Sequence, residues 1–220
     1  MLKDTSVIIA AGGKGARMGR PKQLLKINGK ETLLRTILAF KKVKRVKEII
    51  VVTTPENFKI ISQKVKGIKF APAGTERIES VKNGLKEVSK DIALIAVQDG
   101  ARPLVEPKHI EVCLKAAKKD KAAVLGVFVK DTIKVVKDDK VVKTLSRSEL
   151  FAAQTPQCYR AEVLRHALKK YGNKILATDE SQLVEKLGIK VTAVVGDYRN
   201  LKITTPEDLI IASALCKKRK

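Results

Sequence analysis

Short apolar segments alternate along this chain with segments of helical periodicity, and this alternation restricts the fold more than any other feature. The apolar segments predict strands at residues 6–11, 48–54, 68–73, 92–99, 122–129 and 190–197. Apolar positions at helical spacing predict helices at residues 31–43, 55–65, 77–89, 107–120, 160–172, 179–188 and 204–215. Strands that are apolar on both faces need cover on both sides. The pattern therefore predicts an α/β fold, with helices on both faces of a mostly parallel sheet.

One segment interrupts the alternation. Residues 132–146 read TIKVVKDDKVVKTLS, which predicts two half-exposed strands around a turn at Asp138-Asp139. A lone hairpin is only marginally stable in water. We therefore expect a β-arm at about residues 131–150 that projects from the sheet and packs against a second subunit, giving a homodimer. The rest of residues 1–220 is expected to form one domain.

Length and composition limit the class of protein. The 220 residues, 44% of them hydrophobic, suffice for one sizeable core. No apolar run approaches the roughly 18 residues of a membrane helix, and the apolar N-terminal run leads directly into a glycine loop, so we expect a cytoplasmic protein without membrane contact. The three cysteines have no CxxC spacing and there are only two histidines, which argues against a disulfide framework, a zinc site or Ser–His catalysis.

The formal net charge of +23 has two interpretations. The protein could be a nucleic-acid-binding module, or its lysines could be dispersed over the surface with a modest excess around an anionic substrate. The lysines are spread along the whole chain, and aromatic residues for base stacking are scarce at 4%. We favour dispersed charge and expect no specific nucleic-acid partner, with the binding module as the alternative from another class.

The stretch IAAGGKGARMGRPKQ at residues 9–23 combines glycines with Lys14, Arg17, Arg20 and Lys22. It follows the first predicted strand, and ligands of open parallel sheets bind beyond the carboxyl ends of the strands. Glycine lets backbone N–H groups approach phosphate oxygens closely. The loop matches neither the Walker pattern nor GxGxxG. Glycines and cations together predict a site for a nucleoside triphosphate.

This loop resembles the signature of nucleotidyltransferases that make activated sugars and alditols, most of all the 2-C-methyl-D-erythritol 4-phosphate cytidylyltransferase family. Further segments match that family in order: AGTERIESVKNGL (73–85), VQDGARPLV (97–105), KDTIK (130–134), AAQTPQ (152–157), ATDESQLVEKLG (177–188) and NLKITTPEDLIIA (200–212). The resemblance implies a Rossmann-like nucleotidyltransferase fold and transfer of a cytidylyl group from CTP to an alditol phosphate, with Mg²⁺ or another divalent cation.

The first loop departs from the usual AAGxGxRM form by an extra residue, giving AAGGKGARM, which is closer to sugar-1-phosphate nucleotidyltransferases. Ribitol-5-phosphate cytidylyltransferase and sugar-1-phosphate nucleotidyltransferase therefore stay open as alternatives. Each would join two anionic reactants, so the protein has to neutralise their repulsion rather than supply a nucleophile.

The resemblance assigns roles to particular residues. Arg17 and Lys22 are the catalytic candidates, and they are joined by Arg147 and Lys202 as stabilisers of transition-state charge. Asp99, at the end of a predicted strand, is the candidate metal ligand. Nucleotide-binding roles fall on Ala10, Ala11, Gly12, Gly13, Gly15, Gly74, Thr75, Ser80, Asp99 and Gly100. Acceptor-binding roles fall on Arg102, Thr132, Arg147, Thr155 and Lys202.

Overall fold

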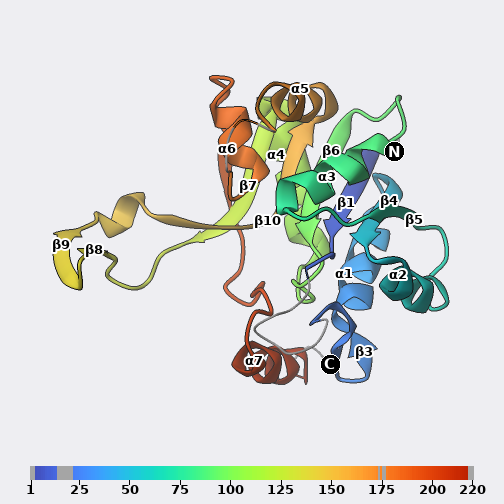
Figure 1. The fold of residues 1–220 in the computed structure, drawn as a ribbon, viewed down its shortest axis with the longest axis horizontal. Helices are drawn as coiled ribbons and strands as arrows, with labels where there is room; N and C mark the ends of the chain where they lie inside the picture. The colour runs from blue at the N-terminus through green and yellow to red at the C-terminus, as the bar shows by residue number, and fades with distance from the viewer. Residues whose placement is uncertain (1–2, 14–21, 173, 175–176, 218–220) are drawn as a thin grey trace.

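A seven-stranded sheet forms the centre of the molecule (Figure 1). The computed structural model describes residues 3–13, 22–172, 174 and 177–217. The strands of this sheet are β1 (Thr5–Ala10), β4 (Val46–Thr53), β5 (Lys69–Pro72), β6 (Leu94–Asp99), β7 (Ala122–Phe128), β10 (Phe151–Arg160) and β11 (Thr192–Val195). Their order across the sheet is β11-β7-β10-β6-β1-β4-β5. All neighbours run parallel except β10, which is antiparallel to β6 and β7, so the predicted mostly parallel sheet is confirmed.

Helices cover both faces of the sheet, as predicted. The helices are α1 (Thr32–Lys41), α2 (Pro55–Ser62), α3 (Arg77–Lys86), α4 (Pro107–Asp120), α5 (Ala161–Tyr171), α6 (Glu180–Glu185) and α7 (Pro206–Lys217). Buried side chains of α1, α2 and α4 belong to one hydrophobic core, and those of α3, α5 and α6 belong to a second. Successive residues of β1 serve the two cores in turn: Val7 and Ile9 face the first, and Ile8 faces the second.

The strand β10 was not expected from the sequence, although it lies in the middle of the sheet. Its run FAAQTPQCYR contains Pro156, which has no N–H for a ladder, and polar Gln154 and Gln157. The pairing of β10 with β7 shifts register between Ala153 and Gln157, which accommodates the proline. The polar side chains find hydrogen-bond partners in the folded chain, since Gln157 donates to Asp179 and accepts from Tyr159, and Gln154 donates to the Asp197 carbonyl. Tertiary pairing therefore outweighs local preference here.

The predicted β-arm is present as β8 (Lys134–Lys137) and β9 (Lys140–Thr144), which form a separate two-stranded sheet. Asp138 and Asp139 both have positive φ, as the central residues of a tight hairpin turn require. The arm projects well away from the central sheet (Figure 1), and a short 3-10 helix, η3 (Arg147–Glu149), leads back to β10. Every residue of both arm strands is exposed.

Helix α7 packs with the small hairpin β2 (Lys26–Ile27) and β3 (Lys30–Glu31) at one end of the sheet. Ile27, Ala212 and Ile203 are buried together in a third, smaller core. The backbone N–H of Ile203 donates to the carbonyl of Ala101 at 2.8 Å, which fixes the segment before α7 against the loop after β6. No helix in the described ranges has the length and apolar character to span a bilayer.

Candidate active site

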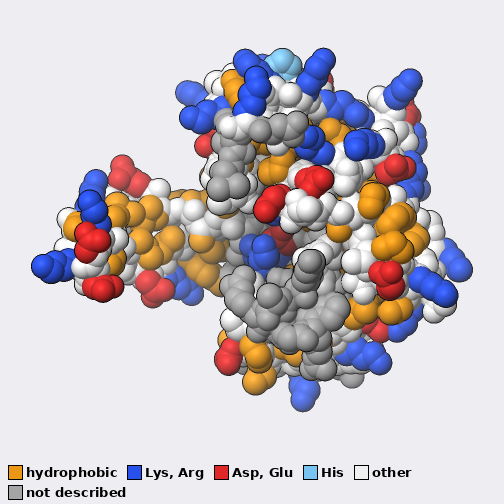
Figure 2. All heavy atoms as spheres, viewed as in Figure 1, with side chains coloured by type: hydrophobic (Ala, Val, Ile, Leu, Met, Phe, Trp, Pro, Cys, Tyr) orange, Lys and Arg blue, Asp and Glu red, His pale blue; other side chains and the backbone are white. Residues whose placement is uncertain are grey.

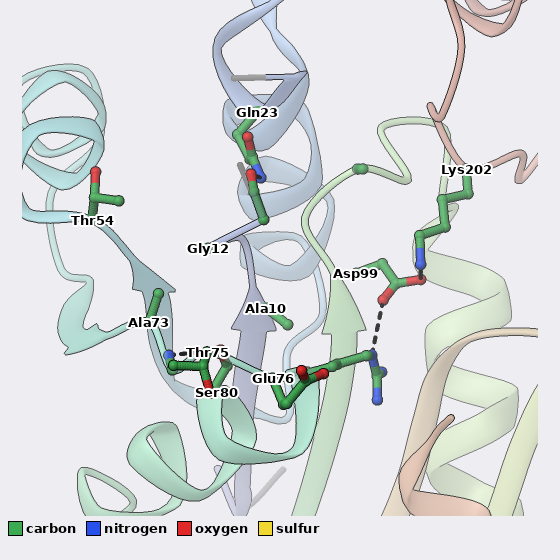
Figure 3. A pocket seen from close by; sticks show the side chains of 14 residues that line it. Ala10, Gly12, Gln23, Thr54, Ala73, Thr75, Glu76, Ser80, Asp99 and Lys202 are labelled. Atoms are coloured by element: carbon green, nitrogen blue, oxygen red, sulfur yellow. Dashed lines mark hydrogen bonds and ion pairs between the residues drawn. The ribbon is translucent and has the colours of Figure 1, made fainter. Parts of the chain in front are cut away.

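A cavity of about 700 Å³ opens beyond the carboxyl ends of β1, β5 and β6. This is where an open parallel sheet binds its ligands. In Figure 3, Ser80 and Thr75 lie on one side of the end of β1, and Asp99 and Lys202 lie on the other. The described residues that line the cavity are Ala10, Gly12, Gly13, Gln23, Thr54, Ala73, Gly74, Thr75, Glu76, Arg77, Ser80, Asp99, Ala101 and Lys202.

The glycine loop after β1 approaches the loop after β5 so closely at Gly12 that no side chain would fit there. A Cβ at Gly12 would lie 2.2 Å from the Cβ of Ala73. A hydrogen bond fixes the backbone at Gly13: Gln23, in the 3-10 helix η2 (Lys22–Leu24), donates its Nε2 hydrogen to the Gly13 carbonyl at 2.8 Å. Ala11 is buried beneath the loop, and its carbonyl accepts from Thr53 Oγ1. Gly12 therefore permits the close approach of the two loops at the cavity floor.

The loop between β5 and α3 forms one wall of the cavity. The backbone N–H of Gly74 donates to Ser80 Oγ at 2.9 Å, and the Thr75 backbone and hydroxyl both donate to Glu79 Oε2, at 2.7 and 2.8 Å. Ser80 Oγ thus accepts a hydrogen bond from the loop, and Ser80 also lines the cavity. These hydrogen bonds fix the loop at the cavity wall, and the predicted nucleotide-binding role of Gly74, Thr75 and Ser80 stays a prediction.

Asp99 is the centre of charge on the opposite wall. Its Oδ2 lies 3.1 Å from Lys202 Nζ and 3.3 Å from Arg102 Nε, and its Oδ1 lies 3.5 Å from Arg77 Nε. Burial by itself would raise the pKa of Asp99, but the charges of Arg77, Lys202 and Arg102 outweigh it and lower the pKa to about 2. Asp99 is therefore ionised at neutral pH and surrounded by cations.

Two predicted acceptor-binding residues support Asp99 and do not line the cavity. Thr155 is buried, and its Oγ1 accepts from the backbone N–H of Asp99 at 3.0 Å. Arg102 is also buried and donates its Nη1 hydrogen to the Asn200 carbonyl at 2.7 Å, while burial lowers its pKa against the opposing pull of Asp99. The neighbouring Gly100 stands under the first loop, where a Cβ would lie 2.9 Å from that of Ala11. These residues hold the wall in place.

The pair formed by Arg77 and Glu180 was missed in the sequence. Arg77 Nη1 lies 2.5 Å from Glu180 Oε1 and 2.7 Å from Oε2, and Glu180 is completely buried. Burial raises the pKa of Glu180, and the charge of Arg77 opposes that rise. The sequence feature that could have indicated a site role for Arg77 is its position two residues after Gly74-Thr75. Glu180 gave no such signal, because an acidic residue at a helix start is ordinarily a favourable first-turn charge.

Some predicted site residues are not brought to this cavity. Thr132 and Arg147 flank the arm, where both are exposed, and Arg147 donates its Nη1 hydrogen to the Lys130 carbonyl at 3.0 Å. Lys22 begins η2, but its side chain lies outside the described residues. Gly15 and Arg17, together with Lys14 and Arg20, lie outside them altogether. The roles of these residues stay predictions.

Comparisons with known proteins agree with this geometry. A family model described as 2-C-methyl-D-erythritol 4-phosphate cytidylyltransferase matches residues 5–218. A relative of that name from Caldanaerobacter subterraneus is 43% identical, with 98% of this chain and 100% of the relative covered. One from Endomicrobium trichonymphae is 44% identical, with coverage of 96% and 98%.

Solved structures give the same result. The 4-diphosphocytidyl-2C-methyl-D-erythritol synthase of Anaerococcus prevotii superposes with a TM-score of 0.87 at 33% identity, covering 98% of this chain and 96% of the other. The 2-C-methyl-D-erythritol 4-phosphate cytidylyltransferase of Thermus thermophilus superposes with a TM-score of 0.82 at 32% identity, covering 96% and 98%. With a loop-lined cavity at the carboxyl edge of its sheet and matches along nearly its full length, this chain belongs to the 2-C-methyl-D-erythritol 4-phosphate cytidylyltransferase family of nucleotidyltransferases.

Proposed function

We propose that this protein transfers a cytidylyl group from CTP to 2-C-methyl-D-erythritol 4-phosphate, releasing pyrophosphate and giving 4-diphosphocytidyl-2-C-methyl-D-erythritol, an isoprenoid precursor of the non-mevalonate pathway. The observation that carries the proposal is the two-sided cavity. Its Gly74–Ser80 wall suits a nucleobase, and its Asp99–Lys202 wall suits a polar, phosphorylated acceptor. Relatives over the full length of the chain bear the name of this activity.

The reaction needs charge compensation rather than covalent help. A phosphate oxygen of the acceptor attacks the α-phosphorus of CTP, and the bond from that phosphorus to the bridging oxygen of the leaving pyrophosphate breaks. Lys202 supplies a partly exposed ammonium at the acceptor wall. Arg17 and Lys22 are proposed to stabilise the charge on the triphosphate, because positioned cations contribute most where charge develops in the transition state.

Asp99 supplies a carboxylate of the kind that a divalent cation binds, and the cation would share its oxygens with Arg77, Arg102 and Lys202. Mg²⁺ typically keeps several waters and takes one or two carboxylates together with substrate phosphates. The described ranges contain no cluster of three or more His, Cys, Asp or Glu side chains, so a cage made by the protein alone is not formed there. Asp99 is the residue that would hold Mg²⁺, which when bound would neutralise charge on the triphosphate.

We also propose that the β-arm joins two copies of the chain into a homodimer. Val136, Val141 and Val142 of the arm are 57–62% exposed, and hydrophobic side chains gather along the arm in Figure 2. A second subunit would bury these side chains and steady a hairpin that is marginal by itself. Thr132 and Arg147, which lie at the base of the arm, could then complete the acceptor site of the partner.

The decisive experiment is an assay of the purified protein with CTP or UTP and each candidate acceptor. Product with CTP and methylerythritol phosphate, at a kcat/KM at least tenfold above that with ribitol 5-phosphate, is the expected result. Turnover confined to ribitol 5-phosphate, or a preference for UTP with a sugar 1-phosphate, would overturn the proposed substrate. Pyrophosphate release measured in parallel identifies the transfer.

A further inference from the structure

Arg77 and Glu180 form an ion pair that the reaction described above does not use. Both oxygens of Glu180 contact the same guanidinium nitrogen of Arg77, at 2.5 and 2.7 Å. The Glu180 side chain is completely inaccessible to solvent, whereas Arg77 is 25% exposed and lines the cavity. The pair therefore runs from the interior of the protein to the wall of the candidate active site.

Arg77 also contacts a second carboxylate. It is the first residue of α3, and its Nε lies 3.5 Å from Oδ1 of Asp99 at the end of β6. Glu180 is the first residue of α6. One guanidinium thus connects the starts of two helices with the strand end that carries the candidate metal ligand. Three distant parts of the chain therefore meet at the Arg77 side chain.

The contacts to Asp99 are divided between its two oxygens. Lys202 and Arg102 both approach Oδ2, at 3.1 and 3.3 Å. In the part of the chain that the structure describes, Arg77 is the cation that approaches Oδ1. Without Arg77, the charged contacts among the described residues would all attract the carboxylate through one oxygen. With Arg77 in place, the carboxylate is held from two directions and its plane is defined.

Glu180 is itself fixed by the structure around it. The neighbouring Asp179 caps α6, with its Oδ1 accepting from the Gln182 backbone N–H at 3.2 Å. Its Oδ2 accepts from Gln157 Nε2 at 2.8 Å, and Gln157 Oε1 accepts from Tyr159 OH at 2.8 Å. This chain of hydrogen bonds ties the start of α6 to β10. Glu180 is therefore a rigid anchor for Arg77.

A buried ion pair is by itself weak evidence for a contribution to stability. Replacing a buried ion pair with apolar residues of similar volume is often neutral or stabilising, because both charges lose their hydration. Outer residues that orient a site, in contrast, are retained because reaction rates depend on the geometry of the groups that they hold. We propose that Glu180 and Arg77 are positioning residues, with Glu180 holding Arg77 and Arg77 fixing the Asp99 carboxylate between the nucleotide and acceptor walls. This inference rests on the proposed function.

The test compares Glu180→Gln, Arg77→Met and the double variant with wild type. Asp4→Asn is the matched control, because Asp4 and Arg45 form a similar pair with two contacts, at 2.5 and 3.1 Å. This pair lies near the start of β1, whereas the cavity lies beyond the other end of β1. We expect Glu180→Gln to lower kcat by roughly 10–100-fold, as is usual for residues that orient metal-site ligands, with KM for CTP changed less than about twofold. Asp4→Asn should lower the melting temperature and leave both kinetic constants, measured well below it, unchanged.

A double-variant comparison tests whether Glu180 acts through Arg77. If it does, adding Glu180→Gln to Arg77→Met lowers kcat no further than Arg77→Met alone. Should Arg77→Met fail to fold with Glu180 buried and unpaired, the comparison of Glu180→Gln with Asp4→Asn decides the question. A crystal structure of Glu180→Gln should show Arg77 displaced from Oδ1 of Asp99.

Several results would overturn the inference. Glu180→Gln with wild-type kcat, additive losses in the double variant, or an undisturbed Arg77–Asp99 contact in the crystal would each do so while leaving the proposed function intact. A wild-type protein that forms no product from CTP would overturn the proposed function and this inference together. Activity of the wild type in the same assay thus separates the two failures.

Discussion

Lys202, in the segment before α7, places its Nζ 3.1 Å from Oδ2 of Asp99 at the end of β6. The two residues lie far apart in the sequence and meet because the backbone N–H of Ile203 bonds to the carbonyl of Ala101. One of them is the candidate metal ligand and the other the candidate clamp for the acceptor phosphate. Their contact joins the metal and acceptor parts of the site.

Lys202→Met is expected to reduce kcat/KM for the acceptor by about 10²-fold, as removal of a comparable charge-stabilising donor does elsewhere. The loss should be larger for the acceptor than for CTP, because Lys202 lies opposite the Gly74–Ser80 wall. Initial rates with each substrate varied in turn measure this. Lys47→Met removes a surface pair with Asp91 and serves as the control. Equal kinetics for the two variants would contradict the assignment.

Asp99→Asn should remove a pH-dependent part of the stability. The folded protein holds the pKa of Asp99 at about 2, below the value of about 3.9 for an unfolded aspartate. A lowered pKa stabilises the fold above about pH 4, and this stabilisation is lost as the pH falls toward 2. The difference corresponds to roughly 2–3 kcal/mol at neutral pH. Urea unfolding of both proteins from pH 7 to pH 2.5 should show their free energies of unfolding converging on acidification.

Gly12→Ala should destabilise the protein by about 1–3 kcal/mol through overpacking. The added Cβ would stand 2.2 Å from that of Ala73, so the first loop or the β5–α3 loop has to move. Gly13→Ala is the matched comparison, because its Cβ would lie 3.8 Å from Gln23 Nε2, at ordinary contact distance. Thermal unfolding measures both. Identical melting temperatures for the two variants would contradict the close approach of the loops.

Val141→Glu should weaken dimerisation by at least about tenfold, because it places a charge on the apolar surface of the arm that the partner would cover. Val141 is 62% exposed in the isolated chain. Ile210→Glu is the control, since Ile210 is 71% exposed but lies on α7, away from the arm. Sedimentation velocity across a concentration series gives the dissociation constants. A dimer that is affected only by Ile210→Glu would place the interface elsewhere.

Arg147→Ala should chiefly raise KM for the acceptor, with KM for CTP little changed. The reason is that a guanidinium at the base of the arm can bind a phosphate with two donors, and the arm reaches toward a partner subunit. Within its own chain Arg147 is exposed and bonds to the Lys130 carbonyl. Steady-state kinetics with the acceptor varied provide the measurement. Unchanged constants would refute the placement of Arg147 in the acceptor site.

Much of the fold was predictable because its elements have strong local signals. The helix at Pro107–Asp120 has the predicted bounds, since proline opens it and the apolar spacing is regular to its end. The hairpin turn at Asp138-Asp139 was equally clear. The segment at Phe151–Arg160 had no such signal, because its proline and glutamines are unfavourable in a central strand until their neighbours are known.

Some residues of the candidate site likewise have a local signal in the sequence, and others do not. Gly12, Gly74 and Asp99 stand at strand ends or in glycine loops, which mark a ligand edge in the sequence. The supporting positions of Thr155 and Arg102, and the missed pair of Arg77 and Glu180, depend on which distant segments pack together.

Periodicity, glycines and turn residues act over a few neighbouring positions, so the α/β alternation, the glycine loop and the arm could all be predicted from the amino-acid sequence. The antiparallel position of β10 between β6 and β7, and the convergence of cations from three segments on Asp99, depend instead on how distant parts of the chain pack together. A charge is stabilised or destabilised by whatever lies within a few ångströms of it, and chain folding rather than chain order sets those neighbours.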